Sequence, residues 1–193
     1  MFALKKNQIM KALKIIGIIL ATLFVLVVLL SLLAPKNFRV ERSIVIPTNN
    51  KEVIYKNISQ WTEFLKWNPW LAKDPNAKIR ISGQEGQVGS SYMWEGNKEI
   101  GKGEMTITSF KEFERVEEDL HFIKPFESTN KTIFRMKPED NGYKVSWIIR
   151  GKYSFLFGIV AIFMDMEKMV GPDFEKGLNT LKEKCIADAA VSR

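Results

Sequence analysis

The feature that most constrains this chain is an uncharged apolar run near its N-terminus. Residues 15–34 read IIGIILATLFVLVVLLSLLA, which is 20 residues without a charge. As an α-helix the run would be about 30 Å long, the thickness of the hydrocarbon core of a bilayer. Nothing polar marks a solvent-facing side. The run therefore predicts a transmembrane helix that contacts the lipid bilayer, between a basic tail at 1–14 and a single domain at 35–193.

A cleaved signal peptide is the competing interpretation of the same run. The apolar part of a signal peptide is about 7–15 residues long and ends at a cleavage site. This run is longer, and Pro35 follows it directly, which makes a poor cleavage junction. Four lysines and no acidic residue precede the run, and a short basic tail normally stays in the cytoplasm. We therefore expect a single-pass membrane protein whose domain is extracytoplasmic.

The net charge of +7 does not point to nucleic acid, because of where the charges lie. The four lysines of the tail account for more than half of it and leave 25 basic and 22 acidic residues in the rest of the chain. These residues mix the two signs, as in FKEFERVEED, whereas a nucleic-acid-binding domain concentrates basic charge on one face. We expect no nucleic-acid partner, and protein partners stay open.

Metal sites and nucleophilic catalysis need clustered donors, and this chain has one histidine and one cysteine. Cys185 alone cannot form an internal disulfide or a cysteine-based zinc cage. Strand alternation places Leu120 and Phe122 on one face of their strand and His121 on the other face. We therefore interpret His121 as a surface residue. The sequence predicts no metal, no cofactor and no catalytic residue.

Strand and helix patterns follow the apolar run in an order that indicates an α+β domain. Period-two alternation predicts a strand at 37–46, and helical spacing predicts two short helices between 50 and 67. Helical patterns return at 155–170 and 174–184, with an interruption at Gly171-Pro172-Asp173. Between them, short turns such as Asp140-Asn141-Gly142 separate six strands of an antiparallel sheet, near 77–82, 90–96, 100–110, 116–122, 129–137 and 143–149.

Five stretches of the domain resemble a known superfamily. They are FLKWNPW (64–70), GQVGSSYMWEGN (86–97), IGKGEMTI (100–107), VSWIIRG (145–151) and MEKMVGPDFEKGLNTLK (166–182). In this order they resemble the SRPBCC or polyketide cyclase/dehydrase-like branch of the START-like, helix-grip proteins. The resemblance implies a curved antiparallel sheet wrapped around a long C-terminal helix. It also implies a cavity between them that takes hydrophobic or amphipathic small molecules.

The apolar side chains on the expected concave face are the candidate ligand-binding residues. Aromatic and methionine side chains adapt to varied apolar ligands, although the same residues would also make an ordinary packed core. Residues of the C-terminal helical region would close the site from the other side. The candidates are Trp67, Trp70, Tyr92, Trp94, Met105, Phe122, Phe134, Met136, Trp147, Phe163, Met166 and Met169.

Three of the five tryptophans lie within WTEFLKWNPW (61–70). Such a cluster could stack bases or sugars, anchor to a membrane surface, or line an apolar pocket. Base stacking needs a basic groove, which the two nearby lysines do not provide. Trp61 belongs to a helix face, whereas Trp67 and Trp70 flank the point where the helix ends. We expect these two to gate the cavity or to plug it, and a membrane-interface role stays open.

The predicted function is a membrane-anchored START-like domain that binds a hydrophobic or lipid-like small molecule. One alternative is a polyketide cyclase-like enzyme, which needs a polar group in the cavity, with Glu118 or Tyr92 as candidates. The other is an envelope stress or assembly module that acts without a ligand. Glu118 shares a strand face with apolar neighbours, and we expect it near a rim or in an ion pair with Arg135 or Arg150.

Overall fold

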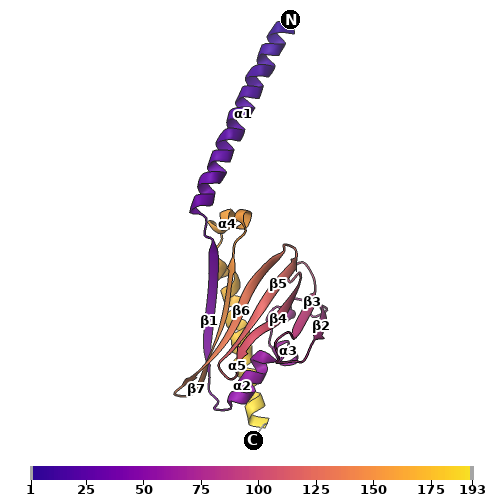
Figure 1. Cartoon of the computed structure of the whole chain (residues 1–193), viewed down its shortest axis with the longest axis vertical. Helices are drawn as coiled ribbons and strands as arrows, with labels where there is room; N and C mark the ends of the chain where they lie inside the picture. The colour runs from indigo at the N-terminus through magenta and orange to yellow at the C-terminus, as the bar shows by residue number, and fades with distance from the viewer. Residues whose placement is uncertain (1, 192–193) are drawn as a thin grey trace. The chain divides into compact units, whose positions relative to one another are not determined.

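The structure is a computed structural model that describes residues 2–191. It divides into two compact units, namely Met1–Lys36 with Tyr153–Asp165, and Asn37–Lys152 with Met166–Arg193. The first unit carries the N-terminal apolar helix, and the second carries the sheet and the long C-terminal helix (Figure 1).

The first unit consists of α1 (Phe2–Leu33) and the short helix α4 (Phe155–Ala161). α1 is long and apolar enough to cross a membrane over Leu13–Leu33, a stretch of 21 residues with none of it buried. The apolar run was predicted at 15–34, and the helix ends one residue earlier. It stops shortly before Pro35, because a proline disfavours the helical conformation in the residue that precedes it.

The second unit is built on one antiparallel sheet of seven strands. The strand order is β1-β7-β6-β5-β4-β3-β2, so β2 to β7 form a meander and β1 returns to pair with β7. β5 lies in the middle of the sheet, and its side chains therefore have strands on both sides. The strands are β1 (Asn37–Ile46), β2 (Lys78–Ser82), β3 (Ser91–Glu95), β4 (Lys102–Lys111), β5 (Arg115–Lys124), β6 (Ser128–Glu139) and β7 (Gly142–Lys152).

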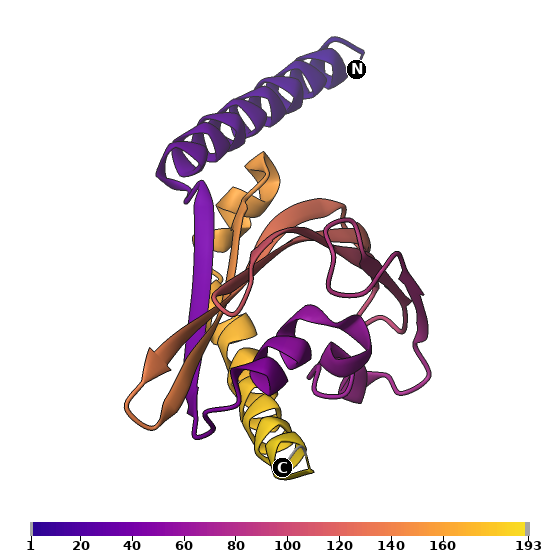
Figure 2. The ribbon, with the colours of Figure 1, turned by 60° about the horizontal axis from the view of Figure 1, so that its bottom comes forward.

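Helices cover the concave face of this sheet. The long helix α5 (Met166–Val191) runs along it, and α2 (Lys51–Ser59), α3 (Trp61–Phe64) and the 3₁₀ turn η1 (Leu71–Lys73) fill the rest. Figure 2 shows the sheet arching over α2 and α3, with α5 beside them. The predicted α+β architecture, a curved antiparallel sheet around a long C-terminal helix, is confirmed.

The break in the C-terminal helical region lies earlier than the sequence pattern predicts. We expected one helix at 155–170 and a new one after Gly171-Pro172-Asp173. In the structure α4 ends at Ala161, the chain leaves the helix at 162–165, and α5 then runs without interruption from Met166 through Pro172. The prediction of a break at Pro172 is wrong because tertiary contacts hold the helix on both sides of the proline.

Arg42 of β1 supplies those contacts. Gly171 gives it room, since a Cβ at that position would lie 2.3 Å from the Arg42 guanidinium. Arg42 Nη1 donates to Glu167 Oε2 at 2.5 Å, and Arg42 Nε donates to Glu175 Oε1 at 2.6 Å. One guanidinium therefore bridges the turns before and after Pro172, which lacks the N–H that would continue the helical hydrogen bonding.

Gly142 closes the β6–β7 hairpin and also lies against the end of β1. Its φ is +130°, and a Cβ there would come 2.1 Å from the carbonyl oxygen of Ile46. We expect Gly142→Ala to lower the free energy of unfolding by about 1–3 kcal/mol, from backbone strain and the clash together. Urea unfolding of the full chain in detergent, followed by tryptophan fluorescence, measures this loss. Gly89→Ala is the control, because Gly89 has φ +87° but open space around it; an equal loss in both variants would contradict the clash.

Candidate functional site

Aromatic rings fill the space between the sheet and α5. Trp147 of β7 stacks on Phe174 of α5 with ring centroids 4.2 Å apart, and Trp67 meets Trp147 edge-on at 5.3 Å. Phe64 packs against Trp67 at 4.8 Å and Phe134 against Trp147 at 5.2 Å. The interior is therefore a continuous set of ring contacts, and each ring is held by its neighbours.

Most of the predicted ligand-binding residues come together in this interior. Seven are buried members of one hydrophobic cluster, namely Trp67, Tyr92, Trp94, Met105, Phe134, Met136 and Trp147. Trp70, Phe122 and Met166 are partly buried and pack against the same cluster. Strand alternation found the sheet residues because one face of each strand points inward.

Two predicted residues lie elsewhere. Phe163 belongs to the unit formed with α1 and is 78% exposed. Met169 is on α5 but is 52% exposed, because Val170 and Phe174 set the inward face of the helix and Met169 lies off it. The prediction placed both in a helix that closes the site, and the change of helix boundary at 162–165 removes that arrangement.

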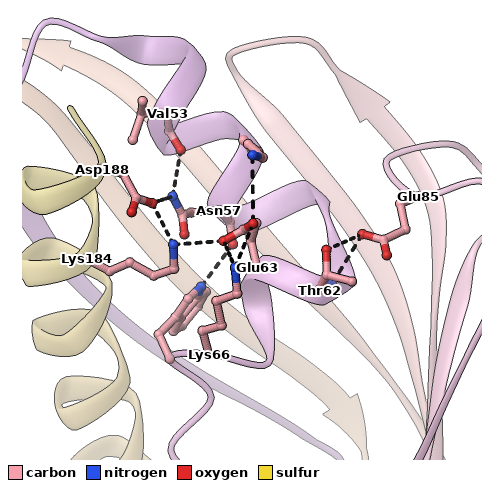
Figure 3. A network of polar contacts seen from close by, with 10 residues as sticks. Val53, Asn57, Thr62, Glu63, Lys66, Glu85, Lys184 and Asp188 are labelled. Carbon is pink, nitrogen blue, oxygen red and sulfur yellow. Dashed lines mark hydrogen bonds and ion pairs between the residues drawn. The ribbon is translucent and has the colours of Figure 1, made fainter. Parts of the chain in front are cut away.

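A polar network joins α2 and α3 to the C-terminal half of α5 (Figure 3). Lys184 Nζ lies 2.8 Å from Glu63 Oε2 and 2.6 Å from Asp188 Oδ2. Asn57 Nδ2 donates to the same Asp188 oxygen at 3.0 Å. Burial alone would raise the pKa of the Glu63 carboxyl, but Lys184 and Lys66 hold this pKa below its ordinary value. The network fixes α3, which carries Trp61 and Phe64, and the turn after it, which carries Trp67.

The two tryptophans of the FLKWNPW stretch have different environments. Trp67 is buried, and its Nε1 donates to the carbonyl oxygen of Asn57 at 2.9 Å. Trp70 is the one tryptophan of the five that is not buried, and it meets Trp147 and Phe174 edge-on. Trp67 therefore packs as a fixed part of the interior, and Trp70 covers the rings from the outside.

Glu118 places a carboxyl group inside this apolar interior. It lies on the central strand β5, on the face of Val116 and Leu120, with Ile107 of β4 and Thr132 of β6 at the opposing positions. Its exposed fraction is 0%, and neither carboxyl oxygen has a hydrogen-bond partner among residues 2–191. The expected rim position or ion pair with an arginine is wrong.

Strand alternation explains why Glu118 forms no ion pair with Arg135 or Arg150. Arg135 pairs in register with Arg115, and Arg150 pairs with Lys131 and Arg39. All of these positions are on the outer face of the sheet, one residue out of phase with the inward positions. Glu118 is therefore separated from the basic side chains by the sheet itself.

Burial raises the pKa of Glu118 well above its ordinary value of 4.5, because water no longer stabilises the charged form. Burial and the neighbouring Glu118 together also raise the pKa of Tyr92, whose hydroxyl contacts Asn68 Nδ2 at 3.3 Å. Burial therefore favours the uncharged acid form of Glu118, in which the carboxyl group can both donate and accept a hydrogen bond.

Other buried side-chain atoms also lack a hydrogen-bond partner within the described part of the chain, among them Trp61 Nε1, Trp147 Nε1 and Ser90 Oγ. An unpaired buried polar group costs about 1–3 kcal/mol, and native interiors pair nearly all of them with protein or water. Trp61 and Trp147 belong to the same hydrophobic cluster, so the interior holds donors that a water or a ligand could pair.

The sequence matches no family model and no curated protein. Solved structures do match it. The Aha1 dimer from Colwellia psychrerythraea is 17% identical and covers 76% of this chain and 94% of its own, with a TM-score of 0.53. An uncharacterised protein from Rhizobium leguminosarum is 10% identical and covers 79% and 96%, with a TM-score of 0.57. Ara h 8.0201 is 11% identical and covers 78% and 99%, with a TM-score of 0.53.

The chain has the helix-grip fold. Seven antiparallel strands in this order, with a long C-terminal helix on the concave face, agree with these structures over nearly their whole length. At such low identity the agreement concerns the fold alone, because the same helix-grip scaffold can carry unrelated functions.

Other features of this helix-grip domain offer less chemistry. A surface hollow of about 730 Å³ is lined by Pro47, Thr48, Asn49, Asn50, Asp140, Asn141 and Ala189, none of which was predicted as a site residue.

The single histidine and the single cysteine lie apart from each other. His121 lies on the outer face with its Nε2 3.4 Å from Glu127 Oε1. Cys185 is buried, and burial raises its pKa to about 12. Within residues 2–191, no three His, Cys, Asp or Glu residues could hold a metal ion.

Proposed function

We propose that this chain is a membrane-anchored helix-grip domain that binds a hydrophobic or lipid-like molecule between its sheet and α5. The observation that carries the proposal is Glu118, a fully buried acid without a partner inside an aromatic interior. The resemblance of five stretches of the sequence to the SRPBCC branch supports this proposal. So does α1, whose apolar stretch has the length that a bilayer requires.

The chemistry of the interior restricts the ligand. An apolar body would replace ring contacts, and each buried methylene contributes about 0.8 kcal/mol. A charged headgroup would need a charged partner, whereas a neutral acid suits a hydroxyl, carbonyl or other uncharged group. We therefore expect a long-chain molecule with one uncharged polar end that hydrogen-bonds to Glu118.

Trp70 marks the side from which such a molecule would reach the interior. Its ring covers the stacked pair Trp147–Phe174 at 5.5 and 5.9 Å, while its backbone N–H donates to Asn68 Oδ1 at 3.0 Å. Rotation of this half-buried ring would expose the pair without disturbing Trp67. Trp70 then acts as the gate and Trp67 as a fixed wall.

The proposed anchor also defines the membrane topology of the chain. Residues 1–14 would form the cytoplasmic tail, 15–34 the transmembrane helix and 35–193 the extracytoplasmic domain. The four lysines before the span favour this orientation, since basic flanking segments tend to stay in the cytoplasm. Protease added to intact spheroplasts would cleave the domain; full protection would contradict the orientation.

The binding test uses the full chain in lipid nanodiscs and a fluorescent long-chain polyene alcohol as the probe. We expect saturable binding, and Glu118→Leu should weaken it roughly two- to tenfold by removing one hydrogen bond. Glu117→Gln is the control, because Glu117 is on the outer face, where it accepts from Ser109 Oγ. Absence of saturable binding, or an equal effect of both substitutions, would contradict the proposal.

One observation favours a second candidate function, a cyclase-like enzyme. An acid with a raised pKa in a dry site can donate a proton to a reacting group, and Glu118 lies close enough to influence the phenol of Tyr92. A ligand recovered after incubation would then differ in mass or chromatographic behaviour, and Glu118→Gln would abolish the change. An unaltered ligand supports binding alone.

A further inference from the structure

The apolar segment at 155–164 has no role in the proposed ligand site. It reads FLFGIVAIFM, without a charged residue. Side chains exposed over this segment are Phe155, Phe157, Val160, Ile162, Phe163 and Met164. Apolar residues scattered singly on a surface need no explanation, but a contiguous group marks an interaction surface.

The segment belongs to the same compact unit as α1 and lies against its end. A Cβ at Gly158 would come 3.3 Å from the carbonyl oxygen of Pro35 and 3.5 Å from Cβ of Ala34. The backbone N–H of Tyr153 donates to the carbonyl oxygen of Lys36 at 3.0 Å. The apolar surface of α1 therefore continues directly onto α4, and Leu32 and Leu33 at the junction are themselves exposed.

We propose that residues 155–164 form a second membrane contact that lies in the lipid interface where α1 leaves the bilayer. This inference rests on the membrane anchor of the proposed function. The 21 residues of Leu13–Leu33 span about 30 Å as a helix, so Pro35 falls at the edge of the hydrocarbon core. A segment packed against Pro35 is then at interfacial depth.

The composition of the segment fits this position. Phenylalanine, isoleucine and methionine side chains can bury themselves at the boundary between headgroups and acyl chains, about 5–10 Å deep. The exposed Lys36 at its border can keep its charged end among the headgroups, and Asp165 ends the uncharged run. Lipid is therefore the occupant that explains both the exposed apolar surface and its place beside α1.

The experiment attaches an environment-sensitive fluorophore to single cysteines of the full chain in nanodiscs that contain spin-labelled lipids. The native Cys185 is buried with a raised pKa, so an introduced cysteine is labelled selectively. Phe163→Cys and Phe155→Cys report on the segment, and Leu20→Cys reports on α1. Val88→Cys, in an exposed loop of the helix-grip domain, is the aqueous control.

We expect the labels at 155 and 163 to emit at shorter wavelength than the label at 88. Lipids spin-labelled near the headgroup should quench them more than lipids labelled at the chain end, and the label at 20 should show the reverse. Water-like emission at both segment positions with an embedded label at 20 would overturn this inference but leave the anchor intact. A shifted emission without lipid quenching would indicate a protein partner and would also overturn it. A water-exposed label at 20 would contradict the anchor, and with it both proposals.

Discussion

Glu118→Gln is expected to become progressively more stable than the natural chain as the pH rises. The folded state holds the Glu118 proton, whereas the unfolded chain releases it near the ordinary pKa of 4.5. The folded state thus binds more protons. The contribution of Glu118 to the free energy of unfolding therefore falls by about 1.4 kcal/mol for each unit of increasing pH. This fall begins near pH 4.5 and ends at the raised pKa that Glu118 has in the folded state. Glutamine keeps the size of the neutral acid and removes this dependence.

The measurement is the difference in free energy of unfolding between the two proteins at a series of pH values. The acid-side contributions of Glu63 and Asp188, whose pKa values are lowered, are present in both proteins and cancel in the difference. Thr132→Val perturbs the position opposite Glu118 without changing a titratable group, so its effect should not vary with pH. A constant difference for Glu118→Gln would show that the carboxyl is not buried as an uncharged acid.

Trp147→Ala is expected to lower the free energy of unfolding by about 3–5 kcal/mol, the range for loss of a large buried aromatic side chain. The indole is 2% exposed and contacts Trp67, Trp70, Phe134 and Phe174. Its loss leaves a cavity at the junction of β7, α5 and the FLKWNPW stretch. Chemical unfolding of the full chain in detergent measures the loss.

Conservative replacements separate packing from hydrogen bonding at this junction. Trp147 Nε1 has no partner in the described chain, whereas Trp67 Nε1 donates to the Asn57 carbonyl oxygen. Trp67→Phe leaves that oxygen unpaired, at a cost of about 1–3 kcal/mol. Trp147→Phe removes an unpaired donor and should be the milder change. A larger loss of stability for Trp147→Phe than for Trp67→Phe would contradict the conclusion that the Trp147 indole N–H is unpaired in the interior.

Local sequence patterns predicted most of the sheet because they depend on near neighbours. The strand at 37–46 has those bounds in the structure, and the two-residue turn at Asp140-Asn141 joins β6 to β7. Alternation also assigned Tyr92, Trp94 and Met105 to the inward face. Each of these features follows from a few consecutive residues.

Features that depend on distant residues were missed. The continuity of α5 through Pro172 rests on Arg42, which is 130 positions earlier in the chain and leaves no local pattern. Alternation put Glu118 on the inward face, but its isolation follows from the register of β4, β5 and β6. Phe163 matched a helical pattern that continues past the true end of α4.

The most direct test of ligand uptake is quenching of tryptophan fluorescence by a brominated long-chain alcohol. All five tryptophans lie between residues 61 and 147 and none lies in α1, so their fluorescence reports on the helix-grip domain. In nanodiscs that contain the full chain, we predict saturable quenching by the alcohol that Glu118→Leu weakens. Brominated phospholipid, which stays in the bilayer, should quench much less. Equal quenching by the two brominated lipids, or no quenching by the alcohol, would contradict binding of a hydrophobic molecule in the interior.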